Sequence, residues 1–301
     1  MISYLDPSAQ QFLNALGGVF QRMTQAQLQL TSGKKLNVVS DAPDSVSPLL
    51  QARARLADNH QTQANLGLVK TEVDTAETSL ESAVSLAEHV RTWGAQAANG
   101  LNSAATQTTL ANQITGALQQ IVSIANTSVD GRFLFSGDSD QTQPYSFDAT
   151  QPVPTGAYQG SAATRQVRDP DGSTFSVAKS AQEIFDSSDP TRSVFGSITA
   201  LTNAVASNDP TAIATVLPNV STALTYLNQQ LAFYGNVQTR VASVVSSAAN
   251  SNVTWKSEIS SLEDADATAA VLQLNTASTD YNAGLASRAK IPQKSLFDYL
   301  G

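Results

Sequence analysis

The chain has 301 residues, a formal net charge of −8 at pH 7 and a pI near 4.7. Such an acidic chain offers no basic face to neutralise phosphates, which argues against a nucleic-acid partner. It has no cysteine, which excludes disulfides, thiolate metal sites and a cysteine nucleophile.

The N-terminal residues do not have the pattern of a cleavable signal peptide. Residues 1–7 have neither a basic region nor an apolar core, and no apolar run approaches the ~18 residues that a membrane span needs. We therefore expect a soluble chain that, if it leaves the cell, uses a route that reads no ordinary signal peptide.

The first predicted helix spans residues 8–31 and ends at Gly33. Residues 33–48 are expected to be irregular, because Pro43 and Pro48 break helices. Apolar residues three or four apart form one face of the first helix: Phe12, Leu16, Val19, Met23, Ala26 and Leu30.

A second helix is predicted from near Ser47, with Pro48 at its first position, to Asn99. Its apolar seam has the spacing of a coiled coil and changes phase at Leu66. The seam consists of Leu49, Ala52, Leu56, Asn59, Gln63 and Leu66, followed by Val69, Val73, Ala76, Leu80, Ala83, Ala87 and Val90. A third helix, over residues 104–128, has one apolar face: Leu110, Ile114, Leu118, Ile121 and Ala125.

The middle of the chain has the signals of a small β region. A short strand is predicted at residues 132–135, and a hairpin joins residues 165–168 to 174–177 through the turn Asp169-Pro170-Asp171-Gly172. One helical turn is expected at residues 180–185.

Helix is predicted again at residues 193–208, and the longest helix starts near Ala212 with a kink around Pro218. The polar seam residues Gln238 and Asn252 are of the kind that sets register in coiled coils. Its seam is Val220, Leu224, Leu227, Leu231, Tyr234, Gln238, Val241, Val245, Ala248, Asn252, Trp255, Ile259 and Leu262. Pro292 is expected to stop the last helix.

The two long seams are natural partners in antiparallel packing, because each is a narrow apolar stripe at an opposite end of the sequence. The predicted fold is mainly α with a small β insert: a long antiparallel coiled coil of N- and C-terminal helices with an outward β-rich domain. An ordinary helical bundle is the alternative. The first and last ~30 residues carry one more apolar face each, with nothing obvious in the monomer to cover it. We expect these ends to be disordered alone or bound to neighbours. The predicted segments are 1–44, 45–130, 131–192, 193–274 and 275–301.

No catalytic, cofactor-binding or metal site is predicted. His60 and His89 are 29 residues apart, roughly 43 Å along one helix, so they cannot share a site within it. Asp138, Asp140 and the turn at 169–172 lack the full ligand set of a calcium loop and are interpreted as turns. No phosphate loop, dinucleotide fingerprint or serine-nucleophile motif is present.

Charged residues near the two ends are interpreted as contacts. Glu263, Asp264 and Asp266 are expected on one helical turn, facing a basic residue of a neighbouring subunit. Lys34 and Lys35 either complement the dipole of the first helix or make such a contact themselves. Trp255 is more consistent with a core position than with a subunit contact.

Two segments resemble those of bacterial flagellins and their relatives. The first is Leu30-Thr31-Ser32-Gly33-Lys34-Lys35-Leu36-Asn37 with Ser40-Asp41-Ala42-Pro43, and the second is residues 259–267, ISSLEDADA. The resemblance covers roughly residues 10–137 and 218–300. Ala42 departs from it, because relatives carry a second acidic residue there, which leaves any role of that pair in a subunit contact without support.

Within this family, Asp130-Gly131-Arg132-Phe133-Leu134-Phe135-Ser136-Gly137 and the ending Ser295-Leu296-Phe297-Asp298-Tyr299-Leu300 resemble the hook-associated protein 3 branch more than flagellin. A flagellin or minor flagellin is the alternative. A ligand-binding role of the β insert stays open, and an enzyme is the least supported class.

The resemblance implies a structural subunit exported through the flagellar type III apparatus and assembled outside the cell as a ring between hook and filament. Its implied partners are copies of itself, hook-associated protein 1, flagellin and a cytoplasmic export chaperone at the C-terminal helix; no nucleic acid, membrane or cofactor is implied. The low share of charged residues, 14 %, suits packing against copies. The family-motif residues expected to serve assembly are Leu30, Ser32, Gly33, Lys34, Asn37, Asp41, Pro43, Ile259, Leu262, Asp264, Asp266, Leu296 and Leu300.

Overall fold

The computed structural model describes residues 7–99, 101–168 and 173–290, and the chain divides into two compact units. The terminal unit takes the chain up to His60 and again from Asn250 onward, and the central unit takes residues 61–249. Both long helices contribute to both units.

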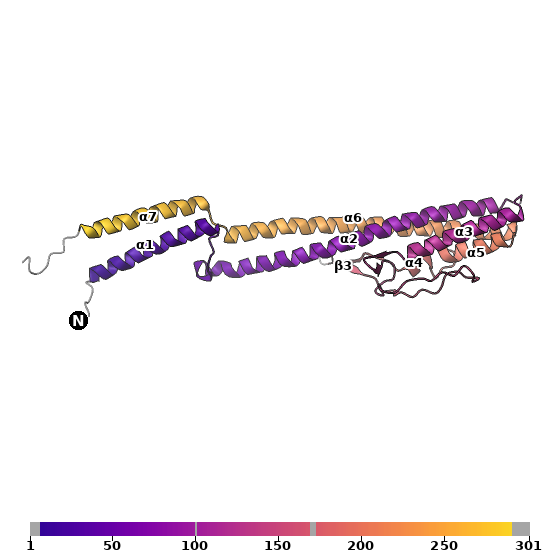
Figure 1. Cartoon of the computed structure of the whole chain (residues 1–301), viewed down its shortest axis with the longest axis horizontal. Coiled ribbons are helices and arrows are strands. Elements are labelled where there is room, and N and C mark those ends of the chain that lie inside the picture. The colour runs from indigo at the N-terminus through magenta and orange to yellow at the C-terminus, as the bar shows by residue number, and fades with distance from the viewer. Residues whose placement is uncertain (1–6, 100, 169–172, 291–301) are drawn as a thin grey trace, which may run out of the picture. The chain divides into compact units, whose positions relative to one another are not determined.

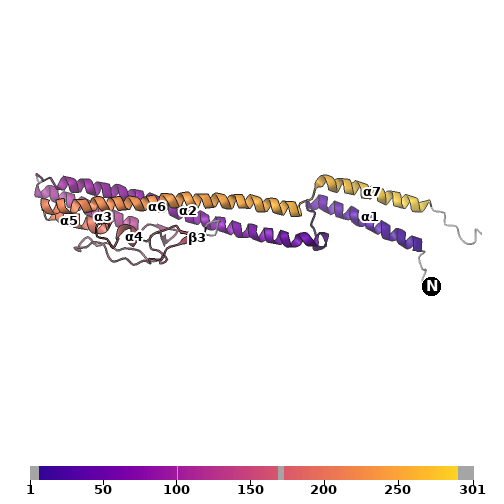
Figure 2. The ribbon, with the colours of Figure 1, turned by 180° about the vertical axis from the view of Figure 1, so that it is seen from behind.

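The described part of the terminal unit consists of helices joined by short linkers. Its first helix is α1 (Pro7–Ser32), followed by a single 3-10 turn, η1 (Val39–Asp41). The first residues of α2 (Pro43–Ala97), the last residues of α6 (Pro210–Glu263) and α7 (Ala267–Ala289) complete it. Figures 1 and 2 show α1 alongside α7 in both views.

The pairing of α1 with α7 is antiparallel and rests on small residues. The α1 face predicted from the sequence turns toward α7, with Ala26 fully buried. On α7, Ala270 and Ala277 are buried, and at Gly284, one heptad further, a Cβ would lie in ordinary contact with Leu16, 3.7 Å from its Cδ1. The expectation that nothing within the chain covers these two faces was therefore wrong, because two faces of matching spacing cover each other.

Both ends of α2 differ from the prediction. The helix α2 begins at Pro43 rather than near Ser47, so Pro48 lies inside it. Proline at a first helical position loses no hydrogen bond, because the N–H it lacks would have no partner in the helix. The region predicted as irregular up to residue 48 is shortened accordingly, and α2 ends at Ala97, two residues before the predicted end.

The central unit holds the main core. It contains α2 from Gln61, α3 (Ala104–Ala125), α5 (Val194–Ala206) and α6 up to Ala249. Figure 1 shows α2 beside α6, and α3 lies against α5. The predicted faces are buried, among them Leu80, Ile114, Leu118, Ile121, Ile198, Leu201 and Leu227. The helix α6 begins at Pro210 and passes through Pro218 without ending.

The β insert consists of two short hairpins and one turn of helix. Strand β1 (Ser128–Val129) pairs with β2 (Arg132–Phe133), and β3 (Gln166–Arg168) pairs with β4 (Thr174–Ser176), both antiparallel. The helix α4 (Ala181–Phe185) follows, capped by Ser180. The second hairpin was predicted, although its turn lies outside the described residues. The first was predicted only as one strand.

The first hairpin closes through a tight turn. Asp130 and Gly131 both have positive φ, 52° and 77°, which is the backbone of a tight two-residue hairpin turn. Aspartate followed by glycine suits this conformation, because aspartate tolerates positive φ and glycine adopts it freely.

Aromatic side chains join the insert to the helices of the central unit. The rings of Phe135 and Tyr234 meet edge to face with centroids 6.2 Å apart, and Phe185 stacks on Phe195 at 5.6 Å. Tyr145 packs edge to face on Phe195 at 5.0 Å. All five are buried. The insert is thus anchored by a shared apolar core rather than by its short strands.

Candidate assembly site

The two family-motif segments, far apart in the sequence, meet in the terminal unit. The Lys35 N–H donates to the Glu263 carbonyl at 2.8 Å, and the Ala265 N–H donates to the Gly33 carbonyl at 2.9 Å. Between these bonds, Lys34 and Asp264 form an antiparallel bridge. The linker after α1 and the linker after α6 are therefore held together by their backbones.

The helix α1 ends at this point because of the conformation of Gly33. Gly33 has φ of +71°, the left-handed conformation that commonly follows a helix, and its N–H donates to the Gln29 carbonyl at 2.9 Å. The Ser32 hydroxyl donates to the Leu28 carbonyl at 2.7 Å and accepts from the Lys34 N–H at 3.1 Å. These bonds aim residues 34–35 at the end of α6.

Glu263 is the charged centre of the site. Its side chain is almost fully buried, yet it accepts hydrogen bonds from the Lys34 ammonium and from Nη2 of Arg53, the latter at 2.5 Å. These bonds, that from Lys34 foremost, hold the pKa of Glu263 below its ordinary value despite the opposing effect of burial. The Lys35 ammonium donates to the Ser261 carbonyl at 2.6 Å. We call the cluster of Lys34, Lys35, Arg53 and Glu263 the latch.

The linker between α1 and α2 is shaped by two polar side chains. Oδ2 of Asp41 accepts from the backbone N–H groups of Asn37 and Val38, at 2.8 and 2.9 Å. Nδ2 of Asn37 donates to the Lys34 carbonyl at 2.8 Å. This folding exposes Val38 and Val39, which are 59 % and 69 % accessible and border an apolar hollow of about 670 Å³ beside the latch.

The three acidic residues that were predicted to share one helical turn are arranged differently. The helix α6 ends at Glu263, so Glu263, Asp264 and Asp266 do not share one helical turn. Asp266 is the N-cap of α7 and accepts from the N–H groups of Thr268 and Ala269 at 2.8 and 3.1 Å. Asp264 is exposed and accepts from the Ser260 hydroxyl. The cap breaks the helix, because its carboxylate satisfies the first N–H groups of the next one.

The remaining predicted residues lie near this site or outside the described part. Leu30, Ile259 and Leu262 are half-buried, and Pro43 starts α2. Leu296 and Leu300 fall among the residues that are not described. Arg53 was not predicted, because nothing local distinguishes it from other basic residues of an exposed helix face. Trp255 is half-buried, with the Arg55 guanidinium 4.9 Å from its ring centre.

The paired helices α1 and α7 keep apolar side chains on their outer faces. Leu272 is 68 % accessible, and Phe20 is 52 % accessible although its ring centre lies 6.4 Å from that of Tyr281 on α7. The fully buried residues of this pair are three alanines, Ala26, Ala270 and Ala277. The other exposed members of these faces are Leu13, Leu28, Val271 and Leu285.

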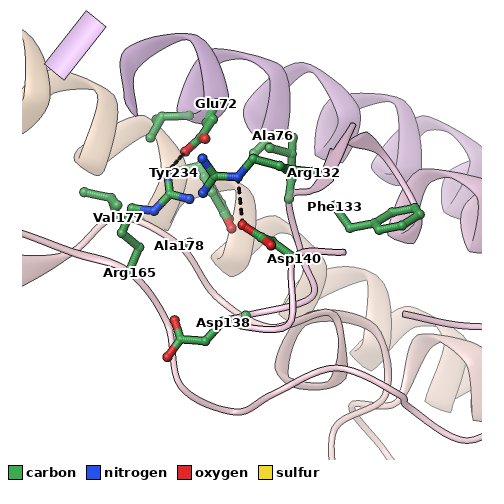
Figure 3. Close-up of a pocket in the computed structure, with 13 residues that line it drawn as sticks. Glu72, Ala76, Arg132, Phe133, Asp138, Asp140, Arg165, Val177, Ala178 and Tyr234 are labelled. Atoms are coloured by element: carbon green, nitrogen blue, oxygen red, sulfur yellow. Dashed lines mark hydrogen bonds and ion pairs between the residues drawn. The ribbon is translucent and has the colours of Figure 1, made fainter. Parts of the chain in front are cut away.

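A polar pocket of about 170 Å³ lies in the central unit where the insert meets α2 (Figure 3). Its charged side chains are largely engaged with one another: Arg165 pairs with Glu72, and Nε of Arg132 donates to Asp140 at 2.7 Å. Arg132 also holds the pKa of Asp140 below its ordinary value. The Arg165–Glu72 pair fastens the insert to α2 and the Arg132–Asp140 pair lies within the insert, so these four charges are explained without a ligand.

The described residues contain no group of three or more acidic or histidine side chains that could hold a metal ion. His60 lies in the terminal unit, while His89 stacks on Trp93 in the central unit at 5.7 Å. In the parts of the chain that the structure describes, no helix is long and apolar enough to cross a bilayer.

Solved structures share this fold. A Vibrio parahaemolyticus protein described as flagellar hook-associated has a TM-score of 0.65 at 19 % identity, covering 74 % of this chain and 100 % of that one. FlgL from Bacillus cereus has a TM-score of 0.57 at 20 % identity, covering 69 % of this chain and 98 % of that one. Hook associated protein-3 from Legionella pneumophila has a TM-score of 0.57 at 14 % identity, covering 70 % of this chain and 96 % of that one. These likenesses confirm the predicted fold.

The sequence comparisons point to one family. Flagellin A of Vibrio anguillarum is 32 % identical over 133 residues, 43 % of this chain, and the match spans only 34 % of that protein. The family model of the bacterial flagellin N-terminal helical region matches residues 7–140, and that of the C-terminal helical region matches residues 217–300. Since these two regions together make up most of the chain, it belongs to the bacterial flagellin family.

Proposed function

We propose that this chain is a structural adaptor of the bacterial flagellum, which joins the hook to the flagellin filament as a ring of copies. The observation that carries the proposal is the pair α1 and α7, which buries three alanines while large apolar side chains such as Leu28 and Leu272 stay exposed. Apolar faces of this kind are typical of surfaces that pack against other subunits.

The choice of the junction within the family is supported by two lines of argument. Residues 130–137 and the ending at residues 295–300 resemble the hook-associated protein 3 branch. Proteins named for a hook-associated role, from Vibrio parahaemolyticus and Legionella pneumophila, share the fold over nearly their whole length. On this proposal the partners are copies of the chain, hook-associated protein 1 and flagellin, with an export chaperone at the C-terminal helix before type III export.

The motif residues that meet at the latch would then set how the terminal helices reach the neighbouring subunits. The proposed segments for the assembly are the terminal ones, 1–44 and 275–301, the two halves of the helical domain, 45–130 and 193–274, and the outward insert, 131–192. No step of this role needs catalysis, which agrees with a pocket whose charges pair with each other.

A flagellin is the second candidate, because the curated relative is a flagellin. Electron microscopy and sedimentation of the purified chain separate the two. An adaptor forms no long filament alone, whereas a flagellin polymerises when seeded with filament fragments. In the bacterium that carries the chain, deletion of its gene should leave hooks without filaments and flagellin in the medium. Long filaments of the pure chain, or normal filaments in the deletion strain, would reject the adaptor role.

A further inference from the structure

We infer that two polar pairs across the seam between α2 and α6 select the register in which these helices first meet. In the terminal unit, Nδ2 of Asn59 donates to Oδ1 of Asn252 at 2.9 Å. In the central unit, Nε2 of Gln238 donates to Oδ1 of Asp74, also at 2.9 Å.

The two pairs describe the same register. From Asn59 to Asp74 α2 advances 15 residues, and from Gln238 to Asn252 α6 advances 14, about two heptads on each helix. Asn252 is 9 % accessible and Asn59 is half-buried, so the amides meet at the seam rather than on the surface.

Apart from its change of phase at Leu66, the apolar part of the seam does not distinguish this register from its neighbours. Leucine, valine and alanine recur at heptad spacing on both helices, so a slip by one heptad again places apolar residues opposite apolar residues. The final structure of the central unit resists such a slip, since Gly94 of α2 fits closely against Leu201 of α5 and Leu217 of α6. The part of that resistance that comes from Leu201 arises only after α5 has packed.

The polar pairs can act before α5 packs, because they depend on α2 and α6 alone. In a register slipped by one heptad, Asn59 would face Val245 or Ile259, by residue spacing. A polar group left without a partner at the seam destabilises the register that leaves it so.

The second pair adds a charge to this selection. In either slipped register Asp74, which pairs with the Lys70 ammonium at 2.5 Å, would lose Gln238 and face Leu231 or Val245. A carboxylate against leucine or valine is disfavoured more than an amide is.

The absence of cysteine allows a direct test in the full chain. A Cβ built at Gly235 lies 3.5 Å from Oε1 of Glu77, so Glu77→Cys with Gly235→Cys reports the native register. Glu77→Cys with Asn228→Cys, or with Ala242→Cys, reports a slip by one heptad in either direction. Each pair is refolded from urea, and a short bis-maleimide is added at set times, with cross-links scored by gel mobility.

In the parent we expect native cross-links from the earliest time. In Asn59→Leu with Asn252→Leu the slipped cross-links should rise about tenfold early in refolding, the factor that 1.4 kcal/mol represents, and then decline. The matched control, Gln61→Leu with Asn250→Leu, changes exposed residues on the same two helices and should behave as the parent.

A second variant keeps the test independent of stability. Val245→Asn with Asn252→Leu moves the α6 amide by one heptad, and should increase the early cross-link of the Asn228→Cys reporter specifically. If neither variant raises a slipped cross-link above the control, the register is selected by other contacts and the inference is overturned.

Discussion

Glu263 and Asp264 are neighbours in the sequence with different surroundings. Glu263 is buried and holds Lys34 and Arg53, while Asp264 is exposed and accepts from Ser260. The sequence alone suggested that both carboxylates face other subunits. The position of Arg53, 210 residues from Glu263, could not be predicted, because ion pairs of that separation depend on helix register.

Replacement of Glu263 by glutamine should loosen the latch. We expect a loss of about 1 to 2 kcal/mol, because a hydrogen-bonded carboxylate is removed while its half-exposed cations regain water. Urea unfolding measures the loss, and amide exchange should rise at residues 34–41. The matched control, Asp264→Asn, should change stability by less than about 0.5 kcal/mol. An equal loss in both variants would contradict this assignment.

The latch should also depend on pH in a defined direction. The pKa of Glu263 in the folded chain lies below its ordinary value of 4.5, so its contribution is present above that value and is lost as pH falls through the lowered folded pKa. The stability difference between the parent and Glu263→Gln should therefore be largest near pH 7 and shrink toward pH 3. Taking this difference removes the pH dependence that the other carboxylates contribute, because both chains share them. A difference independent of pH would show that Glu263 acts by packing alone.

Two glycines with similar backbones allow another matched test. Gly131 and Gly137 have φ of 77° and 63°, so alanine at either position is strained by about 1 to 2 kcal/mol. At Gly137 a Cβ would also lie 2.2 Å from the Ser161 carbonyl oxygen, whereas the space at Gly131 is open. We expect Gly137→Ala to lower the melting temperature clearly more than Gly131→Ala. Equal shifts would mean that the backbone at Ser161 yields easily.

At the scale of elements, the helical faces could be predicted and the helix ends less well. Seams such as Leu80 and Leu227 follow from heptad spacing, which the sequence displays directly. The break between α6 and α7 was missed because Asp266 was interpreted as part of a charged stripe, although its position before Thr268 is also that of an N-cap. The pairing of α1 with α7 was missed because both faces lacked a distinctive partner signal.

The outer faces of α1 and α7 should serve assembly without supporting the monomer. Leu272→Ser with Leu285→Ser changes two exposed side chains, so we expect monomer stability within about 0.5 kcal/mol of the parent. Binding to filament ends carrying flagellin should weaken, as measured by co-sedimentation. Ala277→Leu provides the contrast, because a larger side chain at this buried position should disturb the pairing of α1 with α7 within the monomer. Unchanged co-sedimentation of the serine variant would remove these faces from the interface.

At the scale of the whole molecule, the fold class and family could be predicted from the sequence, and the contacts that join distant segments could not. Long periodic helices and a turn-rich insert are visible in the sequence, whereas the latch and the aromatic anchor of the insert combine residues far apart in the chain. The expectation that Asp264 contacts another subunit stays a prediction: Asp264→Lys should weaken assembly and leave the monomer folded. Normal assembly of that variant would contradict it.

The most direct test of the central claim, that the terminal helices are reserved for neighbours, is amide hydrogen exchange of the purified chain, with sedimentation confirming a monomer. Because α1 and α7 bury three alanines between them, their amides should exchange rapidly, while residues 66–90 and 220–248 of the central core stay protected. Protection of α1 and α7 equal to that of the central core would contradict the claim, because a pair already stable alone needs no neighbour to complete it.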